Sequence, residues 1–392
     1  MQYNNLIIIF ANFGPYHLAR LAAVAKLGRE QNLGVIGIEL AGREIIYPWQ
    51  TGDNQGVAKY TLFPLAAVEE VPSWVMAYRM WAMLQRLNPQ ALAICGITGP
   101  GMLSALAWAR YRKRVAVLMM ATKENDKPRH PLKERLKGMI VSCFDAACVG
   151  GNLSQAYAIK LGIPGAKVFT GYDVVDNAYF AERAAQTRRE ADYYRNKYGL
   201  PENYFLCVSR FIDKKNISGL LKAYKRYCHI CENQTWGLVI CGSGPLETAL
   251  KQQVQDLGLG QMQFAGFRQI DELPIFYSLS QCFIMPSSHF EQWGLVVNEA
   301  MASGLPVLVS KACGCAPDLV QEGVNGSTFD PYDVEGLARL MVKMSSGEVD
   351  LVAMGHASQR IIADWTPEIF AENLLKAVEA AKSSRSKKRF LL

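Results

Sequence analysis

Short apolar runs alternate with amphipathic stretches along most of the chain, and this alternation limits its fold more than any other feature. In the first half the runs are 6–10, 35–40, 91–96, 115–120, 146–150 and 167–170. In the second half they are 205–209, 237–241, 263–265, 282–285 and 307–310. Runs of this length without strict alternation predict parallel strands that are buried on both faces.

Strands that alternate with helices predict right-handed βαβ units, and hence doubly wound, Rossmann-like α/β domains. A polar, helix-prone stretch at 181–198 separates two such series, and 392 residues are enough for two cores. We therefore expect Rossmann-like domains at 1–198 and 199–364. A helix within 365–392 is expected to pack back on the first domain, ahead of a disordered basic tail at 382–389. Ligands bind beyond the carboxyl ends of such strands, so two facing domains would form a cleft.

The segment EQWGLVVNEA at 291–300 is the strongest chemical signal. Gly294, between Trp293 and Leu295, would let a ligand approach the free amides and positive end of an apolar helix, which suits a diphosphate or a sugar hydroxyl. Glu299 would lie buried in that helix and need hydrogen-bond donors, which ribose hydroxyls supply. A buried ion pair is the alternative for Glu299, and a surface carboxylate is the alternative for Glu291.

The segment SRFIDKKN at 209–216 follows the first strand of the second domain. Arg210 offers a bidentate fork and Lys215 a point charge, and together they would neutralise a departing diphosphate. Lys214 is expected to face solvent. Taken alone, the RxxxxK spacing is common.

Loops after other strands fit the same picture. Gly242 would allow close ligand approach, and the loop of Phe267 and Arg268 would present backbone groups to a nucleobase. In the first domain the candidates for the acceptor side of the cleft are Gly14, His17, Lys123, Arg129 and His130. A structural role is an equal alternative for His17.

Together these motifs resemble family 4 glycosyltransferases. The pairs Glu291/Glu299 and Arg210/Lys215 carry the resemblance, with GSGP at 242–245, SGLPVLVS at 303–310, GYDVVDNAYF at 171–180 and NGSTFDPYD at 325–333. The resemblance is close over roughly residues 140–340, whereas the first 130 residues share only the order of predicted strands and helices.

The resemblance implies the GT-B fold and a retaining hexosyltransferase. Such an enzyme moves a sugar from a UDP-, GDP- or ADP-sugar to a glycan, lipid-linked or small-molecule acceptor, as in polysaccharide biosynthesis for the cell envelope. By resemblance, Glu291, Lys215 and Arg210 are catalytic, Glu299 binds ribose, and the first domain selects the acceptor. No further cofactor is implied. Many relatives carry a histidine after the fourth strand, but this loop reads Ala121-Thr122-Lys123-Glu124, so one donor-sugar contact is unassigned.

Two other functions stay open: a non-catalytic sugar-nucleotide-binding protein of the same fold, and a GT-B relative such as a nucleotide-sugar epimerase. Four thiols at Cys228, Cys231, Cys313 and Cys315 would suit zinc if they converged, but the first pair lies in an amphipathic helix. We therefore expect no metal site.

The net charge of +7 is concentrated at 110–114, at 123–137 and in the tail. Such a face would attract an anionic membrane surface, while a solvated face with no partner is an equally weighted alternative. The first apolar run has no basic segment before it and no cleavage site after it, and no run is long enough to span a bilayer. We expect a cytoplasmic protein, peripheral at the inner face of the membrane if that face is used, with no nucleic-acid partner.

Overall fold

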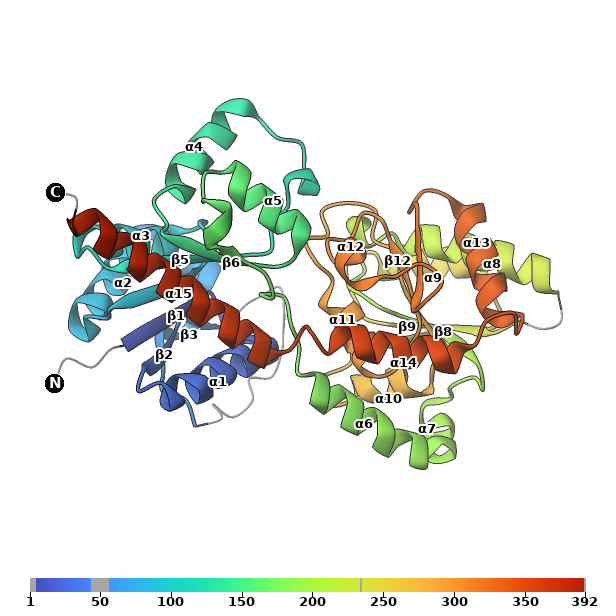
Figure 1. Ribbon diagram of the computed structural model, residues 1–392. Coiled ribbons are helices and arrows are strands. Elements are labelled where there is room, and N and C mark those ends of the chain that lie inside the picture. The colour runs from blue at the N-terminus through green and yellow to red at the C-terminus, as the bar shows by residue number, and fades with distance from the viewer. Residues whose placement is uncertain (1–4, 44–55, 233–234, 391–392) are drawn as a thin grey trace. The chain divides into compact units, whose positions relative to one another are not determined.

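The computed structural model describes residues 5–43, 56–232 and 235–390, which form two compact units (Figure 1). The first unit comprises Met1–Glu124, Pro128–Val175 and Trp365–Leu392, and the second comprises Asn125–Lys127 and Asp176–Asp364.

A seven-stranded parallel sheet forms the centre of the first unit, in the order β3-β2-β1-β4-β5-β6-β7. Its strands are β1 (Asn5–Phe10), β2 (Gly34–Arg43), β3 (Lys59–Ala67), β4 (Ala91–Cys95), β5 (Val115–Met120), β6 (Ala146–Val149) and β7 (Val168–Phe169). The strand order reverses between β1 and β4, the kind of position at which doubly wound sheets bind ligands.

Helices cover both faces of this sheet. They are α1 (Pro15–Glu30), α2 (Ser73–Leu87), α3 (Pro100–Tyr111), α4 (Pro131–Val141), α5 (Asn152–Lys160) and α15 (Pro367–Phe390), with short 3₁₀ turns η1 (Val68–Glu70) and η3 (Gly165–Lys167). A further turn, η2 (Glu124–Asp126), begins in this unit and continues into the segment Asn125–Lys127 of the second unit. Ile7 and Ile9 of β1 join a core with α2 and α3, whereas Leu6 and Ile8 join a second core with α1 and α15. Successive strand residues point to opposite faces, so an uninterrupted apolar run serves both cores.

A six-stranded parallel sheet forms the centre of the second unit, in the order β10-β9-β8-β11-β12-β13. The strands are β8 (Tyr204–Val208), β9 (Gly237–Cys241), β10 (Met262–Gly266), β11 (Cys282–Met285), β12 (Val307–Ser310) and β13 (Gly326–Phe329). The helices are α6 (Asn177–Arg189), α7 (Ala191–Tyr198), α8 (Ile217–Cys231), α9 (Glu247–Asp256), α10 (Leu273–Leu279), α11 (Leu295–Ala302), α12 (Ala316–Leu319), α13 (Val334–Ser345) and α14 (Leu351–Ile362), with the turn η4 (Asp213–Lys215).

The chain passes into the second unit at Asp176, before α6, although the sequence predicted a boundary at 198. Polar contacts explain the difference. The Arg188 guanidinium of α6 donates to the carbonyls of Ser278 at 3.1 Å and Ser303 at 2.6 Å, and the Asn177 amide donates to the Ile362 carbonyl at 2.8 Å. Helices α6 and α7 thus belong to the second unit.

The last helix, α15, returns to the first unit, where it packs along α1 (Figure 1). The helix continues to Phe390, whereas the sequence predicted a disordered tail from Lys382. Among the described helices, none is both long enough and apolar enough to cross a bilayer.

Candidate functional site

An ion pair joins two loops of the second unit at the carboxyl ends of its strands. Lys215 closes η4, which follows β8, and Glu291 lies between β11 and α11. The Lys215 Nζ and Glu291 Oε2 atoms are 2.5 Å apart, and the buried Ser287 hydroxyl donates to the same oxygen at 3.1 Å. The structure therefore brings together two predicted residues that are distant in sequence.

Lys214 ties the same loops together and does not simply face solvent as predicted. Its Nζ donates to the Phe290 carbonyl at 3.1 Å, and its own carbonyl accepts from the Ser288 amide at 2.9 Å. Phe290 has a φ of 53°, a conformation that a bulky residue adopts only when its surroundings hold it. The loop that carries Glu291 is thus fixed on both sides.

The Glu291 carboxylate stays ionised although only 8% of the residue is exposed. Burial by itself would raise the pKa, but the charges of Lys215 and Lys214 outweigh it and hold the pKa of Glu291 below its ordinary value. Burial also removes the surface-carboxylate alternative for this residue.

Gly294 caps α11 in a conformation that no other residue adopts easily, with a φ of 115°. A Cβ atom there would lie 2.7 Å from both the Cε and Sδ atoms of Met285. Beside it, the Trp293 indole donates to the Asn298 Oδ1 atom at 2.9 Å, and Leu295 is half-buried. Buried side chains therefore hold the backbone in place at the start of α11.

Glu299 lies in the second turn of α11 and is completely buried. The Tyr277 hydroxyl of α10 donates to its Oε2 atom at 2.8 Å. Sequence reasoning missed Tyr277, which stands in the apolar helix LPIFYSL and looks like a core residue. Its hydroxyl was the available signal, because a buried tyrosine needs a hydrogen-bond partner.

Arg210 and Gly242 lie on neighbouring strand ends. Arg210 follows β8 and is half-buried. Gly242 follows β9 with a φ of 146°, and a Cβ atom on it would lie 1.8 Å from the Ser209 carbonyl oxygen. Only glycine fits there, because the two loops pack backbone against backbone.

Phe267 and Arg268 follow β10 but differ in their surroundings. The Phe267 side chain is exposed. The Arg268 guanidinium instead donates to the Ala265 carbonyl at 2.7 Å, pairs with Glu272 at 3.0 Å, and stacks on the ring of Tyr198 at 5.2 Å. Arg268 therefore holds its own loop against α7.

In the first unit, Gly14 and His17, two of the candidates for acceptor binding, lie directly after β1. The His17 Nδ1 atom is 2.9 Å from the Asn12 carbonyl oxygen, and its ring stacks on Phe10 at 4.2 Å. Burial, and then the charge of Arg20, lower the pKa of His17 to about 3, so its imidazole is neutral at pH 7.

The other first-unit candidates lie in the loop between β5 and α4. Lys123 is 2% exposed, and its carbonyl accepts from Arg129 at 2.5 Å. Arg129 also donates to the Glu124 carbonyl at 2.7 Å and lies over the Tyr157 ring. His130 is exposed and caps α4.

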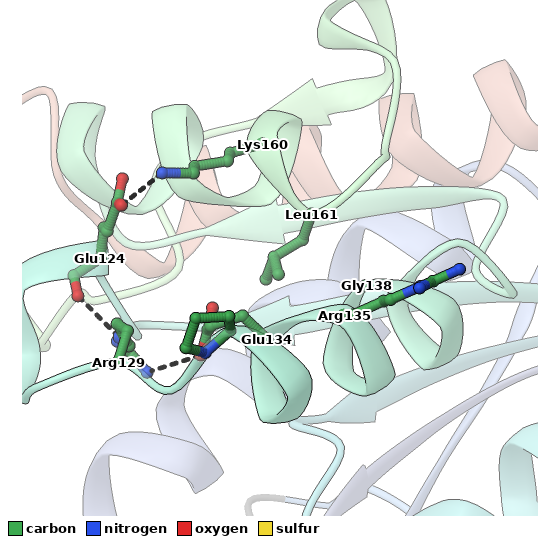
Figure 2. Close-up of a pocket in the computed structure, with 8 residues that line it drawn as sticks. Glu124, Arg129, Glu134, Arg135, Gly138, Lys160 and Leu161 are labelled. Carbon is green, nitrogen blue, oxygen red and sulfur yellow. Dashed lines mark hydrogen bonds and ion pairs between the residues drawn. The ribbon is translucent and has the colours of Figure 1, made fainter.

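A pocket of about 380 Å³ lies beside this loop (Figure 2). Two of the cations that line it are paired with carboxylates: Lys160 bonds to Glu124, and Arg129 pairs with Glu134 at 3.6 Å (Figure 2). The lining residues are Glu124, Arg129, Pro131, Glu134, Arg135, Gly138, Lys160 and Leu161. Much of the positive charge of this pocket is thus already balanced.

Sequence reasoning also missed a buried arginine beside β1. The Arg20 guanidinium donates to the Val174 carbonyl at 3.1 Å, lies 4.0 Å from Asp173, and stacks on Tyr172. Burial raises the pKa of Asp173 to about 6, against the opposing charge of Arg20. These contacts fasten α1 to the segment after β7.

The four cysteines that were considered as zinc ligands, with no metal site expected, lie on α8 (Cys228 and Cys231) and in a buried segment after β12 (Cys313 and Cys315). Within residues 5–43, 56–232 and 235–390, no three His, Cys, Asp or Glu side chains come together in a group that would hold a metal ion.

Comparison with known proteins points to one group. Residues 191–360 match the model of the family described as Glycosyl transferases group 1. A GDP-mannose-dependent alpha-(1-6)-phosphatidylinositol monomannoside mannosyltransferase of Mycobacterium tuberculosis is 28% identical over 200 residues, 49% of this chain and 51% of that protein. An amylovoran biosynthesis glycosyltransferase of Erwinia amylovora, AmsK, is 28% identical over 183 residues, 44% of each chain. The chain thus spans about half the length of these curated relatives.

Solved structures match over almost the whole chain. A glycosyltransferase from Rickettsia africae has a TM-score of 0.74 at 14% identity, covering 97% of this chain and 99% of that one. The Anabaena protein HepE, solved in complex with UDP, has a TM-score of 0.72 at 17% identity, covering 96% and 99%. The two parallel α/β units therefore have the GT-B fold, and the second unit carries the match to the group 1 glycosyl transferases.

Proposed function

We propose that this protein is a retaining glycosyltransferase that moves a hexose from a nucleotide diphosphate sugar to a carbohydrate or lipid-linked acceptor. The observation that carries the proposal is the ion pair between Lys215 and the buried Glu291, in loops at the strand ends of the second unit and three residues before the Gly294 cap of α11. The family match over residues 191–360 supports it, because it spans every one of these residues.

Each group has a defined task in this reaction. When the bond between the anomeric carbon and the diphosphate oxygen breaks, negative charge develops on the leaving group. Lys215 and Arg210 neutralise that charge, and the amides at the start of α11, next to Trp293 and Leu295, bind the donor through hydrogen bonds. Glu291 orients Lys215 and accepts a donor-sugar hydroxyl. The leaving phosphate takes the proton from the acceptor hydroxyl, whose oxygen forms the new bond to the anomeric carbon.

The nucleoside lies against the remaining groups of the second unit. Glu299 accepts ribose hydroxyls, while Tyr277 holds one of its oxygens. Gly242 leaves room for the diphosphate, and Phe267 lies against the base. The donor is a UDP-, GDP- or ADP-sugar: one relative is named as GDP-mannose-dependent, and one structural neighbour was solved with UDP.

The acceptor belongs to the loops of the first unit, which carry Gly14, His17, Lys123, Arg129 and His130. We propose a cytoplasmic enzyme of polysaccharide or cell-envelope synthesis that reaches a lipid-linked acceptor from the membrane surface. The name of the Mycobacterium relative, which refers to a phosphatidylinositol mannoside, supports an acceptor of this type.

The test begins with the donor. The purified chain is mixed with UDP-, GDP- and ADP-sugars, and thermal unfolding and nucleotide release are recorded. We expect one nucleotide class to raise the unfolding temperature and to be released slowly even without acceptor, with the α-anomer as the first product by NMR. Conversion of the sugar without nucleotide release would establish an epimerase. Stabilisation without any turnover across an acceptor panel would establish a binding protein.

A further inference from the structure

Helix α4 of the first unit exposes a row of aliphatic side chains. Leu132, Leu136 and Met139 are 71%, 58% and 63% exposed. They are spaced by four and three residues, so they lie on one face of the helix. Isolated exposed aliphatic residues are common, but a row of three on one helical face is characteristic of a contact surface.

Positive charge flanks this row on both sides. At 100° per residue, Lys133 and Arg135 fall on opposite edges of the aliphatic face, and both side chains are exposed. The one acidic residue of α4, Glu134, is half-buried instead: it accepts from the Tyr157 hydroxyl at 2.5 Å and pairs with Arg129 (Figure 2). The outward face of α4 is therefore aliphatic and cationic.

The position of α4 links this face to the acceptor loop. The helix begins at Pro131, directly after the β5 loop that carries Lys123, Arg129 and His130, and it lies at the periphery of the first unit (Figure 1). A surface bound by α4 would thus lie beside the loop assigned to the acceptor.

We propose that α4 is an interfacial helix that docks the protein on an anionic phospholipid bilayer. Leu132, Leu136 and Met139 enter the boundary between head groups and acyl chains, while Lys133 and Arg135 contact lipid phosphates. The inference rests on the proposed function, because docking supplies a lipid-linked acceptor to the neighbouring loop. Anionic lipid is the occupant that this combination of aliphatic and cationic side chains fits.

A second exposed face of the same unit provides the matched control. Trp74 and Tyr78 of α2 are 75% and 69% exposed. The cations beside them are held by local rings: Arg79 lies 5.1 Å from the Phe63 centroid and Arg86 lies 5.6 Å from that of Tyr60. The α2 face therefore exposes large apolar side chains as α4 does, but its neighbouring cations lie over aromatic rings of the same unit.

The experiment is flotation of the full chain with vesicles of phosphatidylglycerol and phosphatidylcholine, compared with phosphatidylcholine alone, at low and high salt. We expect binding to the anionic vesicles that weakens with salt. The triple variant Leu132→Ser, Leu136→Ser, Met139→Ser should partition at least ~10-fold less, because it removes most of the inserted apolar surface. Lys133→Gln with Arg135→Gln should weaken binding about 10-fold at low salt and reduce its salt dependence. Trp74→Ser with Tyr78→Ser should bind like the wild type.

Absence of wild-type binding to anionic vesicles, or unchanged binding of the α4 triple variant, overturns the proposal. So does loss of binding in the α2 control with α4 intact. Each variant is also tested without vesicles for its thermal shift with UDP and with GDP, which should equal that of the wild type and shows that it is folded. If no nucleotide binds the wild type, the proposed function is refuted. The membrane-docking proposal is then still decided by flotation, which does not depend on nucleotide binding.

Discussion

Two opposing effects act on the single carboxylate of Glu291. Burial disfavours its charge, and the ammonium groups of Lys215 and Lys214 restore it, so its pKa is lower than in water. The structure fixes that balance with one 2.5 Å contact to Lys215 and one hydrogen bond from Ser287. Replacing Lys215 should therefore affect both the neutralisation of the diphosphate and the pKa of Glu291.

Lys215→Ala should lower turnover at least ~100-fold, the scale of losing one preorganised electrostatic contact. Because the pKa of Glu291 rises once its nearest cation is gone, the acid limb of the pH–rate profile should move to higher pH. Glu291→Gln should lower turnover similarly. Lys251→Ala is the control, since Lys251 pairs with Glu247 on the exposed helix α9 at 2.7 Å. Near wild-type turnover of Lys215→Ala would exclude it from the catalytic set.

Transfer should persist in EDTA, because the leaving diphosphate is neutralised by Arg210 and Lys215 in the proposed reaction. The measurement is nucleotide release before and after chelation, followed by addition of Mg²⁺ or Mn²⁺. Complete loss that either ion restores would show that a metal neutralises the leaving group instead.

His17 should make the protein acid-sensitive. Its pKa falls from 6.5 to about 3 on folding, so between these values the unfolded chain binds a proton that the folded chain does not. The free energy of unfolding should therefore fall as pH drops from 6.5, by up to about 1.4 kcal/mol per pH unit. Denaturant unfolding at pH 7 and pH 4.5 measures the loss, which should be smaller in His17→Gln than in the wild type or in the exposed-site control His229→Gln. Equal losses in all three would contradict a neutral His17.

At the site itself, the sequence revealed the charged residues that follow apolar strands and missed their hydrogen-bond partners. Glu291 and Lys215 stand out because charged residues follow apolar strands. Ser287 and Tyr277 do not, because a serine in a loop and a tyrosine in an apolar helix have common structural explanations. Arg268 shows the converse: it follows a strand, yet its guanidinium is used within its own loop.

Among the elements, the start of α11 depends most on a single residue. Gly294→Ala should reduce donor-induced thermal stabilisation and turnover at least ~10-fold, because the new Cβ would meet Met285 at 2.7 Å and the backbone would have to leave its φ of 115°. Gly260→Ala, in the same unit, is the control: a Cβ there meets nothing within 4 Å. Normal donor binding by Gly294→Ala would show that the α11 amides are not the donor cradle.

The sequence identified all the central strands and two of the four edge strands, β7 and β10. Strand β5 reads VAVLMM and is buried throughout, so its apolar run is unmistakable. The other two edge strands, β3 and β13, were missed: KYTLFPLAA contains a proline and several exposed residues, and GSTF is short and polar. An edge strand tolerates proline and exposed residues, and these interrupt the apolar pattern of β3. Strand β13 is mostly buried, but its four residues are too few and too polar to form an apolar run. Helix α2 was missed as well, within a stretch for which no element was predicted.

At the scale of the whole molecule, apart from the short segment Asn125–Lys127, the chain crosses between units at Asp176 and again at Trp365. The first crossing was misplaced because α6 and α7 are polar and carry no signal of which unit they join. Backbone contacts made by Arg188 decide it, and such contacts between distant residues do not follow from local sequence.

The second crossing makes the first unit depend on the end of the chain. Helix α15 buries Phe370, Leu374, Leu375 and Val378 in the core beside α1. At about 1.5–3 kcal/mol for each fully buried side chain, their loss approaches the total stability of an ordinary domain, ~5–15 kcal/mol. A chain that ends at Asp364 should therefore lose the calorimetric unfolding transition of the first unit and keep that of the second. A chain that ends at Arg385 should keep both, because it retains these four side chains and the 2.9 Å contact between Arg385 and Asp145. Two unchanged transitions in the shorter chain would show that the first unit folds without α15.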